Sequence, residues 1–204
     1  MARIRGAVVG YWCRMRTLPV VTRFVHALER SEALDSVARP VDLASDALGD
    51  GAAVAALRGD WQGHAAHPFL TDIPIGCWTS AALLDLFGGR SARAGAQHLV
   101  GIGLLAAPLV AATGLADYRS VGDGPDRRVA AVHATGNALG VAVYAWSWRR
   151  RRAGAHRRGA LIGCVGLGLL SVTGYLGGHL SFARSTGAGE RGTLDRPEVI
   201  THPI

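Results

Sequence analysis

The chain has 204 residues, of which 49% are hydrophobic and only 18% are charged, and its mean hydropathy is +0.21. An average soluble domain is about 25% charged, so this composition excludes a disordered tail and a solvated repeat protein. The net charge is +7 and all 22 basic residues are arginine, which points to nucleic acid or to a membrane surface as partner. Three cysteines without metal-type spacing indicate no disulfide framework.

Residues 1–60 are predicted to form an N-terminal amphipathic, interfacial segment. Leu18–Val37 has apolar residues three to four apart, as in an amphipathic helix, and Pro40 is expected to end that helix. One or two short helices should follow before residue 58. Arginines lie close to Trp12 and Phe24, so we expect this segment to lie on the membrane surface. A cytosolic tail without membrane contact is the alternative.

Four later stretches of the chain are long, apolar and nearly free of charge. Each is of the length, about 20 residues, that crosses roughly 30 Å of hydrocarbon as a helix. Helices of a soluble bundle carry polar residues along their outer face, and these stretches do not. The sequence therefore predicts an all-α, integral membrane four-helix bundle over residues 61–184, with a loosely ordered tail over 185–204. The predicted spans are Phe69–Phe87, His98–Ala116, Val129–Trp148 and Ala160–Phe182.

The arginines predict the orientation of the spans. They crowd the first and third loops, whereas the second loop mixes arginine with aspartate. By the positive-inside rule the first and third loops are cytoplasmic, and both termini lie outside. We interpret the basic excess as a topology signal, so nucleic-acid binding is not expected. Prolines at positions 74 and 108 are expected to interrupt the first and second spans.

Several ionisable residues fall inside or beside the spans, where they are costly and usually functional. Alternate spans run in the same direction, so His67, His133 and His179 are expected at one membrane face. His64 lies one turn before His67, and Asn137 lies four residues after His133 on the same helical face. Imidazoles at one depth suit haem iron, copper or zinc.

Two carboxylates are expected at the same level as these histidines. Asp72 lies five residues after His67, and Asp117 closes the second span. They could orient a ligating imidazole or relay protons. A third acid, Asp85, is expected to be structural and to pair with Arg90 or Arg93 in the first loop.

A faint internal repeat also runs through the spans. His67 and His133 lie near the starts of the first and third spans, and the second and fourth spans each close with a Thr-Gly pair, at residues 113–114 and 173–174. Two copies of a helical hairpin in the same orientation would give this pattern.

These motifs resemble a bacterial family of small four-helix membrane proteins known as domain of unknown function 2231. The match begins at Gly63-His64-Ala65-Ala66-His67-Pro68, where the family usually has proline in place of Ala65, and covers roughly residues 60–184. It continues through Leu84-Asp85-Leu86, Thr113-Gly114-Leu115-Ala116-Asp117, His133 with Asn137, and Gly174-Tyr175-Leu176-Gly177-Gly178-His179-Leu180.

The resemblance implies no assigned reaction. It does imply a multi-pass protein of the bacterial cytoplasmic (inner) membrane, often joined to or encoded beside Rieske-type iron–sulfur domains, which favours electron transfer. The chain has no Rieske pattern of cysteine and histidine, so an iron–sulfur partner would be a separate protein. Association into a homodimer is a further alternative.

Three hypotheses follow. The first is electron transfer through b-type haem, with His133 and His179 as axial ligands and His67 as a third ligand candidate or a hydrogen-bond partner. Asp72 and Asp117 would then take protons released by a quinol. The second is a single non-haem transition metal held by His64, His67, His133 and His179 with one of the two aspartates. The third is a non-enzymatic membrane anchor that docks a partner and needs no cofactor; whether the protein is an enzyme stays open.

Overall fold

The computed structural model describes residues 19–183, and every regular element within that range is a helix. The all-α prediction is confirmed for this part of the chain. The predicted loose tail over residues 185–204 and the start of the N-terminal segment lie outside the described residues.

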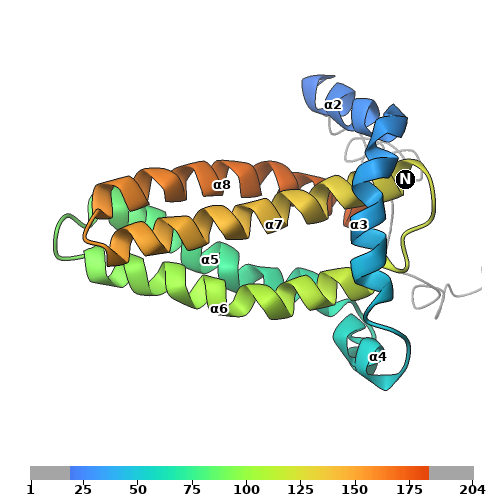
Figure 1. Cartoon of the computed structure of the whole chain (residues 1–204), viewed down its shortest axis with the longest axis horizontal. Helices are drawn as coiled ribbons and strands as arrows, with labels where there is room; N and C mark the ends of the chain where they lie inside the picture. The colour runs from blue at the N-terminus through green and yellow to red at the C-terminus, as the bar shows by residue number, and fades with distance from the viewer. Residues whose placement is uncertain (1–18, 184–204) are drawn as a thin grey trace, which may run out of the picture.

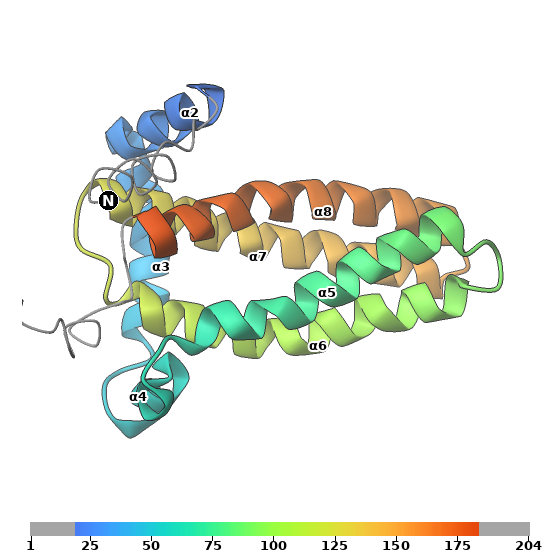
Figure 2. The same cartoon turned by 180° about the vertical axis from the view of Figure 1, so that it is seen from behind.

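Four long helices lie side by side and form the body of the molecule (Figures 1 and 2). Each packs on two neighbours in the cyclic order α5, α6, α7, α8, so α5 and α7 lie diagonally across a shared interior. Both proline positions predicted to interrupt a span instead lie inside continuous helices. The four helices are α5 (Ala66–Phe87), α6 (Arg93–Tyr118), α7 (Pro125–Arg152) and α8 (His156–Gly178), the last continued by a π-helical turn, His179–Ala183.

The two ends of this body differ. The loops at residues 88–92 and 153–155 meet at one end, which we call the arginine end (Figure 1). The loop at 119–124 lies at the opposite end, together with the N-terminal helices, and we call this the cap end. The helices α5 and α7 therefore both run from the cap end to the arginine end.

Two helices, Arg93–Tyr118 and His156–Ser181, are long and apolar enough to cross a membrane by length and composition. Only 28% of the most apolar 18-residue window of each is buried, so most residues of these windows keep some exposed surface. The core helix of a soluble protein would bury most of such a window. Large side chains exposed along the four helices include Phe69, Leu105, Leu161 and Val165.

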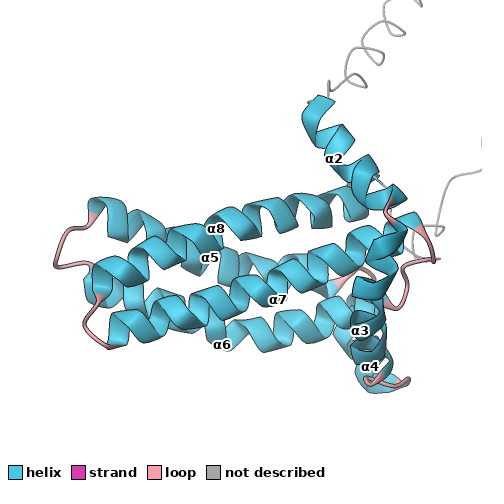
Figure 3. Cartoon of the chain, turned by 45° about the horizontal axis from the view of Figure 1, so that its top comes forward, coloured by secondary structure: helices cyan, strands magenta, loops and turns pink. Residues whose placement is uncertain are grey.

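Three short helices cover the cap end (Figure 3). They are α2 (Pro19–Arg30), α3 (Asp35–Asp46) and α4 (Ala52–Arg58). The prediction of one helix ended by Pro40 is wrong: the chain leaves the helix at Ser31, whose backbone is extended, and Pro40 lies within α3. The reason is tertiary, because this break lets α2 pack on α7 while α3 lies across the ends of α6 and α7.

Acidic side chains of the cap meet the arginines at the cap end of α6 and α7. Asp35 accepts from Arg128 at 2.6 and 3.0 Å, and the hydroxyl of Ser45 donates to the Leu115 carbonyl at 3.0 Å. The further cap contacts are Asp42 with Arg127 and the Tyr118 hydroxyl, and Asp50 with Arg119. The cap therefore neutralises the arginines at this end of the body.

Candidate functional site

Two histidines meet in the interior of the four helices, near the cap end. His67 lies at the start of α5 and His133 lies in the third turn of α7. Their ring centroids are 6.3 Å apart and their planes are nearly perpendicular, at 83°. Because α5 and α7 are diagonal, the two rings bridge the shared interior between the other two helices.

Each imidazole is fixed by a backbone carbonyl of the neighbouring helix. Nδ1 of His67 donates to the Val110 carbonyl at 2.9 Å and lies 3.3 Å from the Thr113 hydroxyl. Nδ1 of His133 donates to the Thr173 carbonyl at 2.7 Å. A carbonyl only accepts, so each neutral ring carries its proton on Nδ1 and keeps a lone pair on Nε2. This is the tautomer and the second-shell contact typical of histidines that bind a metal through Nε2.

Glycines allow the rings to lie so close to the neighbouring helices. A Cβ atom at Gly114 would come within 2.8 Å of the His67 ring, and one at Gly177 within 2.6 Å of the His133 ring. Any larger residue at either position would push the imidazole away from its carbonyl.

The two Nε2 atoms differ in their surroundings. The side-chain amide of Asn137 lies 3.0 Å from Nε2 of His133 and can donate to it. The hydroxyl of Thr173 donates in turn to the Asn137 carbonyl oxygen at 2.6 Å. Among the described residues, no hydrogen bond engages Nε2 of His67. The pair therefore consists of one fully bonded imidazole and one with a free lone pair.

The histidine pair is the first of three layers that repeat along α5 and α7. About three helical turns beyond the histidines, Trp78 on α5 stacks on Tyr144 on α7, with ring centroids 4.0 Å apart and planes at 8°. About two turns further on, Asp85 on α5 faces Arg151 on α7. The partners in every layer have the same sequence separation, so equivalent positions of α5 and α7 touch across the diagonal.

The repeat unit is a hairpin of two helices, α5–α6 in the first copy and α7–α8 in the second. Equivalent residues of α6 and α8 are separated in sequence by slightly fewer residues than those of α5 and α7. Gly114 and Gly177 lie against the two histidines, and Gly103 and Gly166 lie against Trp78 and Tyr144. The Val110 and Thr173 carbonyls that accept from the histidines are related by that same offset. The structure thus supports the repeat of two hairpins but corrects its register: Gly114 corresponds to Gly177, three residues later than the predicted glycine of the Thr-Gly pair.

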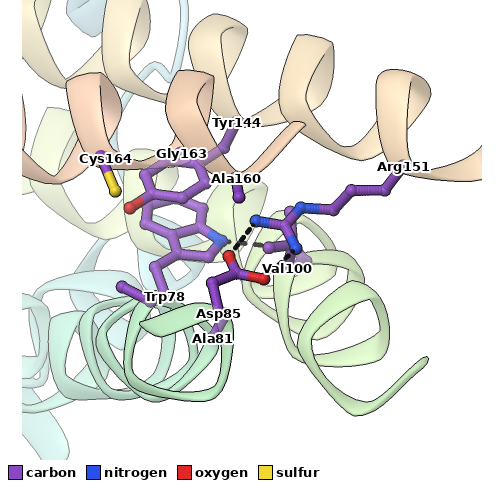
Figure 4. A pocket seen from close by; sticks show the side chains of 10 residues that line it. Trp78, Ala81, Asp85, Val100, Tyr144, Arg151, Ala160, Gly163 and Cys164 are labelled. Atoms are coloured by element: carbon purple, nitrogen blue, oxygen red, sulfur yellow. Dashed lines mark hydrogen bonds and ion pairs between the residues drawn. The ribbon is translucent and has the colours of Figure 1, made fainter. Parts of the chain in front are cut away.

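The third layer is a buried ion pair near the arginine end (Figure 4). The guanidinium of Arg151 donates to both carboxylate oxygens of Asp85, at 2.9 and 2.5 Å, and the imidazole of His156 lies 3.0 Å from the same carboxylate. The prediction that Asp85 pairs with Arg90 or Arg93 is therefore wrong. Those residues are close in sequence, but Arg151 is the repeat equivalent of Asp85 and faces it across the interior.

His179 does not join the histidine pair. Its Nε2 lies 3.7 Å from a carboxylate oxygen of Glu29, a buried residue of α2 that also accepts from Nδ1 of His26 at 2.8 Å. His179 follows Gly177 by two residues, which is about 200° around a helix, so the two face opposite sides. The expected meeting of His133 with His179 is replaced by the meeting of His133 with His67.

The other predicted site residues are dispersed. Asp72 is exposed, because five residues place it about 140° around α5 from His67. His64 is exposed and precedes α5, and Asp117 is half-buried near the end of α6. Among residues 19–183, no group of three or more histidine, cysteine or acidic side chains is arranged to hold a metal ion.

Comparison with known proteins identifies the family. The family model described as "Predicted membrane protein (DUF2231)" matches residues 63–189, more than half of the chain, and the chain belongs to that family. The match includes the whole of the four-helix body and excludes all three helices of the cap. No curated protein and no solved structure matches the chain.

Proposed function

We propose that all four long helices cross the bacterial cytoplasmic membrane as a four-helix bundle, with the arginine end inside and the cap outside. The distribution of charge supports this arrangement. Eight arginines lie in or beside the two loops of the arginine end, whereas the loop at 119–124 and the residues beside it hold three, Arg119, Arg127 and Arg128. Positive charge is retained on the cytoplasmic side of membrane proteins. The outward-facing apolar side chains of α6 and α8 would then contact lipid.

We further propose that this bundle is an electron-transfer protein that holds b-type haem between His67 and His133. The observation that carries the proposal is the pair itself: two repeat-equivalent imidazoles, each with Nδ1 bonded to a carbonyl, facing one interior. Two nitrogens about 2 Å from one metal place ring centroids roughly 6 Å apart, and the observed separation is 6.3 Å. Two histidines would suffice to hold a haem, whereas a structural metal site needs four ligands and a catalytic one at least three.

The chain's own residues would hold and orient the two ligands. When bound, the haem would supply reversible one-electron exchange. The Val110 and Thr173 carbonyls keep both Nδ1 atoms protonated, and the glycines at positions 114 and 177 keep the rings in place. Ligation through Nε2 of His133 requires the amide of Asn137 to release that atom. The electron partner would be a quinol in the membrane or a separate iron–sulfur protein at the cap end, with Asp117, which is half-buried at the cap end of α6, as a proton acceptor.

One observation favours a second candidate, a membrane anchor without cofactor. The hydrogen bonds from Asn137 and to Thr173 already satisfy both nitrogens of His133. In that case the histidine layer stabilises the bundle, and the cap is the surface on which a partner docks.

The visible spectrum of the detergent-purified protein, produced in haem-sufficient cells, decides between the two. We expect a Soret band and a dithionite-dependent α-band that are lost in His67→Ala and in His133→Ala. His98→Ala is the matched control, because His98 is exposed and lies in the arginine-end half of α6. His179→Ala should also keep the spectrum. A colourless, metal-free wild type overturns the haem proposal and leaves the anchor; loss of the bands only in His179→Ala overturns the ligand assignment.

A further inference from the structure

A groove of about 360 Å³ lies on the arginine-end half of the body, between α7 and α8. Trp146 and Arg150 line it from α7, and Arg158, Leu161 and Ile162 line it from α8. The side chains of Trp146 and Leu161 are exposed. The groove therefore combines an apolar wall with two basic groups.

The basic and the apolar side chains of the groove lie at different distances from the arginine end. Arg150 follows Trp146 by one helical turn, and Arg158 precedes Leu161 by three residues on the antiparallel neighbour. Both arginines are thus nearer the arginine end than their apolar neighbours, by roughly 5 to 6 Å at 1.5 Å per residue. A ligand that fills the groove needs an anionic group at the end of the body and an apolar group further in.

The arginines of the groove are free to bind such an anion. Within the described chain, Arg151 is committed to Asp85 and Arg152 lies 4.9 Å over the Trp148 ring. Neither Arg150 nor Arg158 has an acidic partner in the same part of the chain, where Asp85 is the sole acid of the arginine end. Two guanidinium groups without a carboxylate nearby form a strong site for phosphate oxygens.

We propose that this groove binds an anionic phospholipid of the cytoplasmic leaflet. Arg150 and Arg158 bind the headgroup phosphate, and one acyl chain lies along Trp146 and Leu161. Basic pockets between membrane helices on the cytoplasmic side are the known geometry for such lipids. The proposal rests on the four-span orientation proposed above and is independent of haem binding.

Quenching of tryptophan fluorescence by brominated acyl chains tests the site. The full chain is reconstituted in phosphatidylcholine vesicles that contain either brominated phosphatidylglycerol or brominated phosphatidylcholine at the same mole fraction. The signal of Trp146 is the difference between the wild type and Trp146→Phe. The test variant is Arg150→Gln with Arg158→Gln. The matched control, Arg149→Gln with Arg157→Gln, removes two charges from exposed positions of the same segment that do not line the groove.

We expect half-maximal quenching of Trp146 at a lower mole fraction of phosphatidylglycerol than of phosphatidylcholine. The preference should fall about fivefold for each groove arginine removed and should persist in the control. Equal quenching by both lipids, an unchanged preference in the test variant, or an equal loss in the control overturns the proposal. Absence of quenching by either lipid overturns the four-span orientation as well, whereas a colourless protein that keeps the preference refutes only the haem proposal.

Discussion

Neutralising Asp85 should destabilise the protein more than neutralising an exposed acid of the cap such as Asp50. The side chains of Asp85 and Arg151 are 6% and 1% exposed, and two hydrogen bonds join them. Asp85→Asn leaves the guanidinium buried without a counter-charge, which typically costs about 3–5 kcal/mol. The asparagine amide keeps one acceptor oxygen, so one of the two charge-assisted hydrogen bonds, worth about 1.5–3 kcal/mol, is lost as part of that figure.

The assay is the free energy of unfolding in detergent micelles, measured with Asp50→Asn as control. Asp50 also pairs with an arginine, at 2.9 Å, but is 88% exposed, so its loss should cost no more than about 1 kcal/mol. Replacing both buried partners, as Asp85→Leu with Arg151→Met, should restore stability to within about 1 kcal/mol of the wild type. The reasoning is refuted if Asp85→Asn costs no more than the control, or if the double variant is as unstable as Asp85→Asn.

Three further predictions concern the histidine layer, the cap and the orientation. Gly114→Ala should lower the free energy of unfolding by about 1–3 kcal/mol through overpacking against the His67 ring. Gly174→Ala, which has open space around it, should be neutral or stabilising, and equal effects of the two variants in denaturant titrations would contradict the close packing of Gly114 on His67. The hydrogen bond from Arg128 lowers the pKa of Asp35, so the stabilisation by this pair is present at neutral pH and is lost as the pH falls below about 4. The hydrogen-exchange protection factors of α3, corrected for the intrinsic exchange rate at each pH, should therefore fall in acid, and the fall should be smaller in Asp35→Asn. In a cysteine-free background, a cysteine at position 122 should react with an impermeant maleimide in intact cells and one at Arg157 only after permeabilisation; the reverse pattern inverts the orientation.

Much of the helical architecture could be predicted from the sequence, because long apolar stretches without charge report helices directly. The structure places helices over all four predicted spans, and the boundaries at the arginine end follow the arginine-rich loops. That all four helices cross a membrane stays a prediction, since two of them meet the criterion of length and composition. The break at Ser31 could not be read locally, because it depends on how α2 and α3 pack on α7.

The candidate site was harder to predict. The number of helices that precede a residue tells at which end of the body it lies, but not toward which neighbouring helix its side chain points. His67, His133 and His179 were all expected at one face, and only the first two meet. What the sequence analysis lacked was the position of each histidine around its helix relative to Gly114 and Gly177, the glycines against which the two rings pack. The constant sequence separation that relates the partners in the three layers was visible in the sequence. It would have identified both His67 with His133 and Asp85 with Arg151.

The three layers between α5 and α7 differ in whether they permit two identical hairpins to pair with each other. Two copies of the α5–α6 hairpin, from different chains, could form the histidine and aromatic layers almost as well as the native pair does. In the third layer, however, they would bury two aspartates against each other, and two α7–α8 hairpins would bury two arginines. Such mispaired assemblies carry uncompensated like charges in an apolar interior, which is strongly unfavourable. A single ion pair, Asp85 with Arg151, therefore makes the two halves of an otherwise repetitive chain recognise each other rather than themselves.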